Sequence, residues 1–452
     1  MFNKEYQHHY KENLKIASPI ILGQAGHMIA TIADSIMIGR ISSDQLAACS
    51  FANGIFFFLF ILAIGISIGL TPLVGKAHGA NEEKRVQHLF RHGFVVNIFV
   101  GILINILMIA VMPLFKYLGQ PEIVIKYAEN YYLYLTFSIV PYMIFMTFKS
   151  FTDALEITKP GMIVSFFCNG LNIVLNYIFI YGNLGAPRME IEGAGLATLI
   201  SRIAMPILFM FIYLNRAELK KYLKSLRYPV ISFKIIKDIL KIGLPIGVQY
   251  VLEVGAFVGG ALMIGNFGAK ELAAHHIAIN LASLTFLMAT GLSSAATIRV
   301  SNLIGKKDFV NMRKASYSTF VMILIFMIIT ASIFIFLGRE LAIYYVEDPI
   351  KDMYVLDLAA SLLVIAGFFQ IVDGIQVNAL GNLRGMEDVK IPTYITIFSY
   401  WVVTLPICYY LAFIQNMGPK GVWWGYCIGL TIAAAILYLR FEKVSRKKLR
   451  LS

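Results

Sequence analysis

The chain has 452 residues, of which 58% are hydrophobic and only 14% are charged, and its formal net charge is +13. With a mean hydropathy of +0.72 it carries more apolar surface than a water-soluble fold can bury. This composition excludes a soluble globular protein and indicates an integral membrane protein. The positive charge does not require a nucleic-acid partner, because most Lys and Arg residues lie in the breaks between apolar stretches.

Apolar stretches of about 20 residues, long enough to cross a bilayer as helices, recur along the chain. The polar first residues lack the pattern of a cleaved signal, so we expect nothing to be removed. An even number of spans places both termini on one side, and the positive-inside rule assigns that side to the cytoplasm. We predict an all-α protein with twelve transmembrane helices, at residues 15–38, 46–72, 88–114, 127–150, 161–181, 193–214, 237–265, 272–298, 315–338, 353–381, 391–413 and 420–440.

The second half of the chain repeats the first without a gap. A shift of 226 positions, half the chain length, aligns Pro19 with Pro245 and Gly65 with Gly291. A repeat of this kind predicts two pseudo-symmetric six-helix bundles.

The repeat also predicts the domain boundaries. We expect an N-lobe at 1–214, a cytoplasmic linker at 215–236, and a C-lobe at 237–452 that ends in a basic cytoplasmic tail. The basic linker is interpreted as a topology signal, and contact with lipid headgroups is the alternative.

Ionisable residues inside the spans indicate function, because a charge at the bilayer centre costs roughly 2.5–3.5 kcal/mol. Counted from the nearest basic residue, Glu253 lies about 18 Å and Asp373 about 16 Å into the membrane. Two carboxylates at one level could share a proton or supply several of the oxygen ligands that Na⁺ needs. The alternative is two separate acids, each hydrogen-bonded to neighbouring Tyr, Asn or Gln side chains, such as Gln370 or Asn378.

The first half contains a different set of polar residues. Asp34 lies about 28 Å deep, and Asn172 and Asn176, one helical turn apart, lie at about 20 and 25 Å. An acid and two amides at overlapping depth could bind a cation or relay a proton. Arg202, at a similar depth, is the candidate counter-ion of Asp34, so a static salt bridge is one alternative. The two amides alone would instead join neighbouring helices.

Other patterns are given structural interpretations. Gly65-Ile66-Ser67-Ile68-Gly69 fits the nucleophile-elbow string but lies inside a span, so we expect its small residues to allow close helix packing. The His275-His276 pair lacks further ligands for a metal. The sequence contains no P-loop, so ATP is not the expected energy source and no cofactor is predicted. Buried thiols without C-x-x-C spacing are expected at Cys49, Cys168, Cys408 and Cys427.

Motifs along the whole chain, from residue 14 to residue 440, resemble the multidrug and toxic compound extrusion (MATE) family. Acids at both Glu253 and Asp373 are similar to its NorM-type branch. The resemblance implies two six-helix bundles that form a V. It rests on Asp34-Ser35-Ile36-Met37-Ile38-Gly39, Leu46-Ala47-Ala48, Thr158-Lys159-Pro160, Asn172 with Asn176-Tyr177, Glu192-Gly193-Ala194-Gly195-Leu196-Ala197-Thr198, Gly381-Asn382-Leu383-Arg384-Gly385, Pro392, Tyr400-Trp401, Leu405-Pro406, and Gly421 with Trp423 and Gly425.

The resemblance also implies a function. It implies an antiporter, driven by Na⁺ or H⁺, that exports cationic or amphipathic drugs by alternating access between the two lobes. Glu253 and Asp373 resemble the C-lobe cation ligands of the family, so the one metal expected is a Na⁺ there; Asp34, Asn172 and Asn176 resemble its N-lobe site. The partners would be small organic molecules, the coupling ion and membrane lipid. We expect a monomer in the plasma membrane of a bacterium.

Two other classes of protein are alternatives to this antiporter. A lipid-linked oligosaccharide flippase of similar architecture would need more cationic residues facing its cavity, whereas the interior charges here are three acids and Arg202. An integral-membrane enzyme would need a nucleophile, a metal or an acid–base pair in a catalytic context. The sequence offers none of these, so we do not expect an enzyme.

Overall fold

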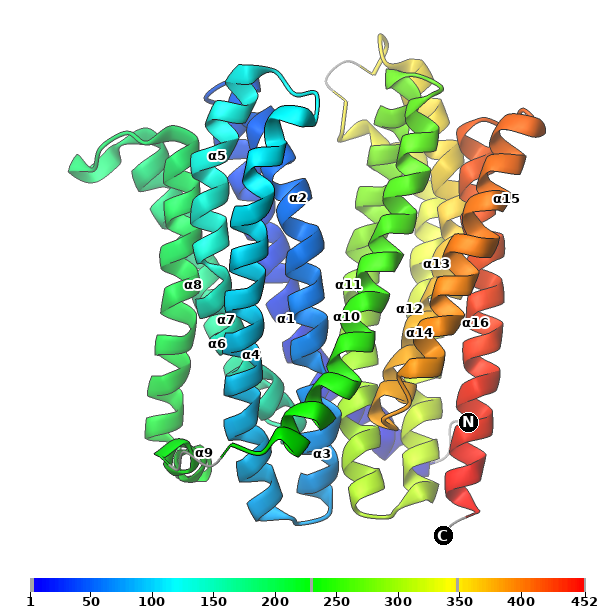
Figure 1. Ribbon diagram of the computed structural model, residues 1–452. Coiled ribbons are helices and arrows are strands. Elements are labelled where there is room, and N and C mark those ends of the chain that lie inside the picture. Colours follow the sequence, from blue (N-terminus) through cyan, green and yellow to red (C-terminus); the bar gives the residue numbers. More distant parts are fainter. Residues whose placement is uncertain (1–3, 228–230, 347–348, 451–452) are drawn as a thin grey trace. The chain divides into compact units, whose positions relative to one another are not determined.

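The computed structural model describes residues 4–227, 231–346 and 349–450, and within these ranges the chain is helical, with no strand (Figure 1). Residues 228–230 of the expected linker lie outside the described part. Twelve helical segments among the described residues are long and apolar enough to cross a membrane, which confirms the predicted class and number of spans. The α-helices are α1 (Lys4–Gly39), α2 (Ser43–Ile68), α3 (Leu70–Gly79), α4 (Glu83–Val111), α5 (Glu122–Phe137), α6 (Ile139–Ala154), α7 (Lys159–Tyr181), α8 (Glu190–Asn215), α9 (Ala217–Leu223), α10 (Phe233–Gly265), α11 (Ala269–Gly305), α12 (Phe309–Ile343), α13 (Met353–Gly385), α14 (Lys390–Ile397), α15 (Leu405–Tyr409) and α16 (Pro419–Leu449).

Several spans are not one regular α-helix. Helices α2 and α3 together form one span, and so do α5 and α6. The eleventh span contains two π-helical segments, Phe398–Thr404 between α14 and α15, and Tyr410–Ile414 after α15. A π-helical turn redirects the side chains that follow it and often marks a functional site. Tyr400, which lies in the first of these segments, belongs to the candidate site described below.

The chain forms two compact units. One contains Met1–Ala17 and Leu252–Ser452, and the other is Ser18–Val251. The predicted lobe boundaries follow the sequence repeat, whereas the compact units follow packing, and the two divisions differ at the first helix of each repeat. Both α1 and α10 pass from one unit to the other partway along their length. The boundaries at 214 and 237 therefore stay a prediction of the repeat.

Buried polar contacts explain why the start of α1 groups with the second half of the chain. Asn13, which is fully buried, donates to the carbonyl oxygen of Ala315 over 3.1 Å and to Ser318 Oγ over 2.6 Å. The guanidinium of Arg299 in turn donates to Asn13 Oδ1 over 2.9 Å and to the carbonyl oxygen of His9 over 3.0 Å. These contacts join α1 to α11 and α12.

In the unit Ser18–Val251, the first half of α10 packs tightly on α2 and on Gly69, which links α2 to α3, through glycines. A Cβ atom built on Gly65 would lie 2.4 Å from Gly247 Cα, and one built on Gly69 would lie 2.5 Å from Gly243 Cα. Only residues without a side chain allow two helix backbones to approach this closely. The expectation that the small residues of this stretch serve helix packing is confirmed.

We therefore expect Gly65→Ala to destabilise the protein by about 1–3 kcal/mol, the usual cost of overpacking a core. The matched control is Gly54→Ala in the same helix, where an added methyl group meets nothing within 4 Å. That control should be neutral or slightly stabilising, because alanine favours a helix over glycine. Thermal unfolding of both variants in detergent tests the contact, and equal melting temperatures would contradict the close approach.

Aromatic rings fill the cores of both units. In the unit Ser18–Val251, the rings of Phe148 and Phe209 stack with centroids 5.6 Å apart, and Phe90 stacks on Tyr213 at the same distance. In the other unit, fully buried Trp423 packs edge-on against Phe369 and donates its indole N–H to His275 Nδ1. His275 is thus part of the core. The thiols of all four cysteines are buried and free, as predicted.

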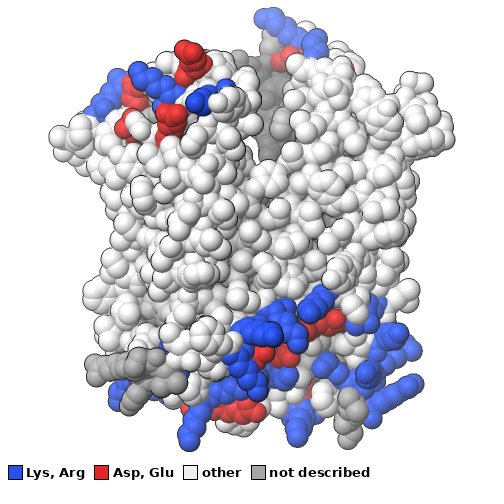
Figure 2. All heavy atoms as spheres, viewed as in Figure 1, with Lys and Arg blue, Asp and Glu red and all other residues white. Residues whose placement is uncertain are grey.

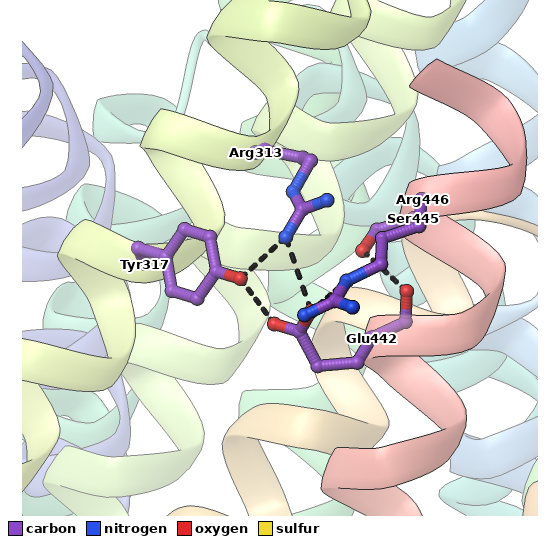
Figure 3. Close-up of polar contacts among 5 residues, drawn as sticks. All are labelled: Arg313, Tyr317, Glu442, Ser445 and Arg446. Carbon is purple, nitrogen blue, oxygen red and sulfur yellow. Dashed lines mark hydrogen bonds and ion pairs between the residues drawn. The ribbon is translucent and has the colours of Figure 1, made fainter. Parts of the chain in front are cut away.

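Helix α16 is joined to α12 by an ionic network (Figure 3). Arg313 Nη2 lies 2.5 Å from Tyr317 Oη and 3.1 Å from Glu442 Oε2, and the Tyr317 hydroxyl donates to Glu442 Oε1. Arg446 approaches the same carboxylate at 2.9 Å. The side chains of Arg313 and Glu442 are mostly buried, so solvent screens their attraction less than it would at an exposed surface.

Charged residues gather at the ends of the spans. On the face drawn in Figure 2, a broad band of uncharged residues separates them, as expected for a surface that contacts lipid. The Lys and Arg side chains of that face are concentrated at one end of the spans.

Candidate ion-coupling sites

Two carboxylates lie in the unit that contains residues 252–452. Glu253 on α10 is 7% exposed, and Asp373 on α13 is 3% exposed. The two groups are close enough to interact electrostatically. Both acids are thus buried in the same unit.

Tyr400 connects Glu253 to the polar face of α13. Its hydroxyl oxygen lies 3.1 Å from Glu253 Oε1, to which it can donate, and it accepts a hydrogen bond from Gln376 Nε2 over 3.0 Å. Tyr400 and Gln376 are almost fully buried. Neither was a candidate in the sequence analysis, although Gln376 follows Asp373 by three residues and therefore shares its helix face.

The carboxyl group of Asp373 lacks a hydrogen-bond partner of the kind that Tyr400 provides for Glu253. Its Oδ1 atom is buried without a hydrogen-bond partner, and so are both amide atoms of Gln370 and the Nδ2 atom of Asn378. The alternative in which Gln370 or Asn378 neutralises Asp373 by hydrogen bonding is therefore not the arrangement observed. Leaving a buried polar atom unpaired typically costs 1–3 kcal/mol. A cation or a proton bound at Asp373 Oδ1 would remove this cost for that oxygen atom.

The unit Ser18–Val251 holds the second predicted set. Asn176 on α7 donates to Asp34 Oδ1 on α1, and its Nδ2 atom also lies 3.4 Å from Asn172 Oδ1. Asn172 Nδ2 lies 3.4 Å from Thr198 Oγ1 on α8. Asn176 Oδ1 is buried with no partner. The acid and the two amides that the sequence placed at overlapping depth thus lie together, and Thr198 of a third helix joins them.

Arg202 lies near this set in an aromatic enclosure. Its guanidinium carbon is 4.7 Å from the ring centroid of Phe60, 5.1 Å from that of Phe56 and 5.2 Å from that of Tyr142. Its Nη1 donates to Ser138 Oγ over 2.8 Å. Cation–π contacts of this kind stabilise a desolvated cation by about 2 kcal/mol or more.

The described residues contain no Arg202–Asp34 ion pair within 4 Å. The guanidinium is held instead by Ser138 and the three rings. A direct salt bridge between Arg202 and Asp34 is therefore not observed. The role of Arg202 as a counter-ion of Asp34 stays a prediction. Among the described residues no group of three or more His, Cys, Asp or Glu side chains could hold a metal ion.

Twelve spans, an internal repeat, and acids buried inside the spans define the class of multi-pass membrane transporters. The model of the MatE family matches residues 19–178 and 245–410, more than half of the chain. The chain belongs to the MATE family, as its motifs predicted.

Relatives of known name cover nearly the whole chain. A probable multidrug resistance protein NorM of Pasteurella multocida is 34% identical over 447 residues, which are 97% of this chain and 95% of the relative. A multidrug resistance protein NorM of Photobacterium profundum is 30% identical over 442 residues, which are 97% of this chain and 96% of the relative. These similarities confirm the NorM-type branch.

Solved structures support the fold. A transporter of the MOP superfamily from Pyrococcus furiosus superposes with a TM-score of 0.90 over 99% of both chains, at 20% identity. A eukaryotic MATE transporter superposes with a TM-score of 0.87 over 98% of this chain and 99% of its own, also at 20% identity. The helical architecture therefore matches that of MATE transporters at low sequence identity.

Proposed function

We propose that the protein is an antiporter that exports cationic or amphipathic organic compounds and is driven by Na⁺ or H⁺ entering in exchange. The observation that supports this most directly is the buried Asp373 Oδ1, which has no hydrogen-bond partner, in the same unit as the second buried acid, Glu253. A carboxylate in a membrane interior is expensive unless a cation or a proton neutralises it. The names of the NorM relatives support the drug-export part of the proposal.

The two carboxylates are given different roles. Glu253 already has a hydrogen-bond donor in Tyr400, so it provides a fixed charge. Asp373 has a free oxygen atom and is the group that changes its state when the ion binds or leaves. In the Na⁺ case, Asp373, Glu253 and the side-chain oxygen of Gln370 would supply ligands of the type that a hard cation prefers. In the H⁺ case, Asp373 would carry the proton.

Alternating access requires that the ion and the drug favour different conformations. One elementary charge crossing 100 mV provides about 2.3 kcal/mol. Reversing a 1:99 population to 99:1 takes about 5.5 kcal/mol, so a concentration gradient or a second charge must contribute to complete switching. We place the protein in the inner membrane of a bacterium as a monomer, with both termini in the cytoplasm.

The test is efflux of a fluorescent cationic dye from proteoliposomes under a Na⁺ gradient and, separately, under a pH gradient. Efflux under one gradient alone identifies the coupling ion. Absence of efflux under both gradients, with folded protein verified, would overturn the proposal. Translocation of a labelled lipid-linked oligosaccharide in the same vesicles would then favour the flippase alternative.

A further inference from the structure

A groove of about 390 Å³ lies between α7 and α8 in the unit Ser18–Val251. Its apolar part includes Ile163 and Phe167 of α7 and Leu208 and Phe211 of α8. Ile163, Phe167 and Phe211 are exposed in the protein, as expected for a surface that contacts lipid. Its volume is within the range of sites that bind small molecules.

The groove is polar at one end only. Helix α7 begins where α8 ends, and the groove there meets Asn215 and Arg216. From Pro160 at that end to Phe167, the lining extends over two helical turns, about 10 Å. The groove is thus amphipathic along its length: it is apolar toward the middle of the spans and cationic at their ends.

The charges at this end are available to a ligand. Arg216 and Lys159 are exposed, and neither side chain has an ion-pair partner among the described residues. Lys159 is the first residue of α7, so the positive end of the α7 dipole adds to the local potential. No acidic residue lines the groove. An anion is therefore favoured at the polar end, and a hydrocarbon chain in the rest of the groove.

We propose that this groove binds an anionic phospholipid, with the phosphate at Arg216 and an acyl chain between Phe167 and Phe211. The polarity of the groove matches a lipid of the leaflet that faces the basic end of the spans. An exported organic cation fits less well, because the charged end of the groove repels it. The proposal does not depend on the transport function, since it concerns the surface of α7 and α8 and not the buried acids.

The experiment places a fluorescent reporter in the groove. The Phe211→Trp variant is reconstituted in vesicles that contain brominated phosphatidylglycerol or brominated phosphatidylcholine, and the quenching of its tryptophan fluorescence is measured. The quenching measured for the parent protein, which has only the native tryptophans, is subtracted. One basic residue near the membrane surface should favour the anionic lipid about fivefold at position 211. Adding Arg216→Gln to the same protein should remove that preference.

A matched reporter separates this site from general attraction to basic residues. Tyr394→Trp lies on an exposed face of α14, one turn from exposed Lys390, and does not line the groove. The site is supported if the preference for the anionic lipid is larger at position 211 than at position 394 and is lost in the Arg216→Gln variant. Equal quenching by both lipids, the same preference at both positions, or a preference unchanged by Arg216→Gln would overturn it. Phe167→Trp, on the opposite wall, serves as the reporter if Phe211→Trp does not fold.

Discussion

Asp373→Asn is expected to leave the protein folded and to lower gradient-driven dye efflux by about tenfold or more, within the 5–150-fold range of coupling between two sites. The amide has the same size as the carboxyl group, so packing in α13 should be preserved. It removes both the charge that attracts a cation and the group that carries a proton. A buried charge without a partner is costly, so the variant should be as thermally stable as the parent protein or more stable.

Asp357→Asn is the matched control, because it makes the same chemical change in the same helix. Asp357 is exposed and lies 3.1 Å from Arg339, in a surface ion pair that contributes at most about 1 kcal/mol. Dye efflux from proteoliposomes should be nearly unchanged by this substitution. Unimpaired efflux by Asp373→Asn would contradict the proposed role of Asp373, whereas equal loss in both variants would indicate a general effect of changing charge in α13.

Asp34→Asn should also reduce gradient-driven efflux by about tenfold, if the set on α1, α7 and α8 takes part in coupling. Asn176 now donates to Asp34, and an amide at position 34 can still accept this bond through its oxygen atom. The fold should therefore persist while the charge is lost. Asp44→Asn, an exposed acid at the start of α2, is the control and should retain full activity.

A double substitution distinguishes coupling from a static charge pair. If Asp34 only balanced Arg202, then Arg202→Met combined with Asp34→Asn would restore efflux, because neither buried charge would remain unpaired. We expect no restoration, because Arg202 is held by Ser138 and three rings and makes no direct ion pair with Asp34. The test is a double-mutant cycle, in which efflux and melting temperature are measured for the two single variants and for the double variant.

The sequence by itself determined the class of protein, the twelve spans, the family and the two sets of buried polar residues. These features depend on local hydrophobicity, on motif order and on distance along a helix. Glu253 and Asp373 could be placed at one depth because each residue of a helix advances by a constant rise. The same reasoning brought Asp34 to the level of Asn176, and the structure joins them by a hydrogen bond.

Only the tertiary structure decided which side chains meet. Tyr400 reaches Glu253 from a π-helical segment, a local irregularity that hydropathy does not reveal. Arg202 is surrounded by rings from α2 and α6, which lie far from it in the sequence. The start of α1 packs with α11 and α12 because Asn13 finds partners there, although the repeat assigns it to the first half. Such contacts depend on the rotation of each helix about its axis and on the identity of its neighbours, which are properties of the packed molecule as a whole.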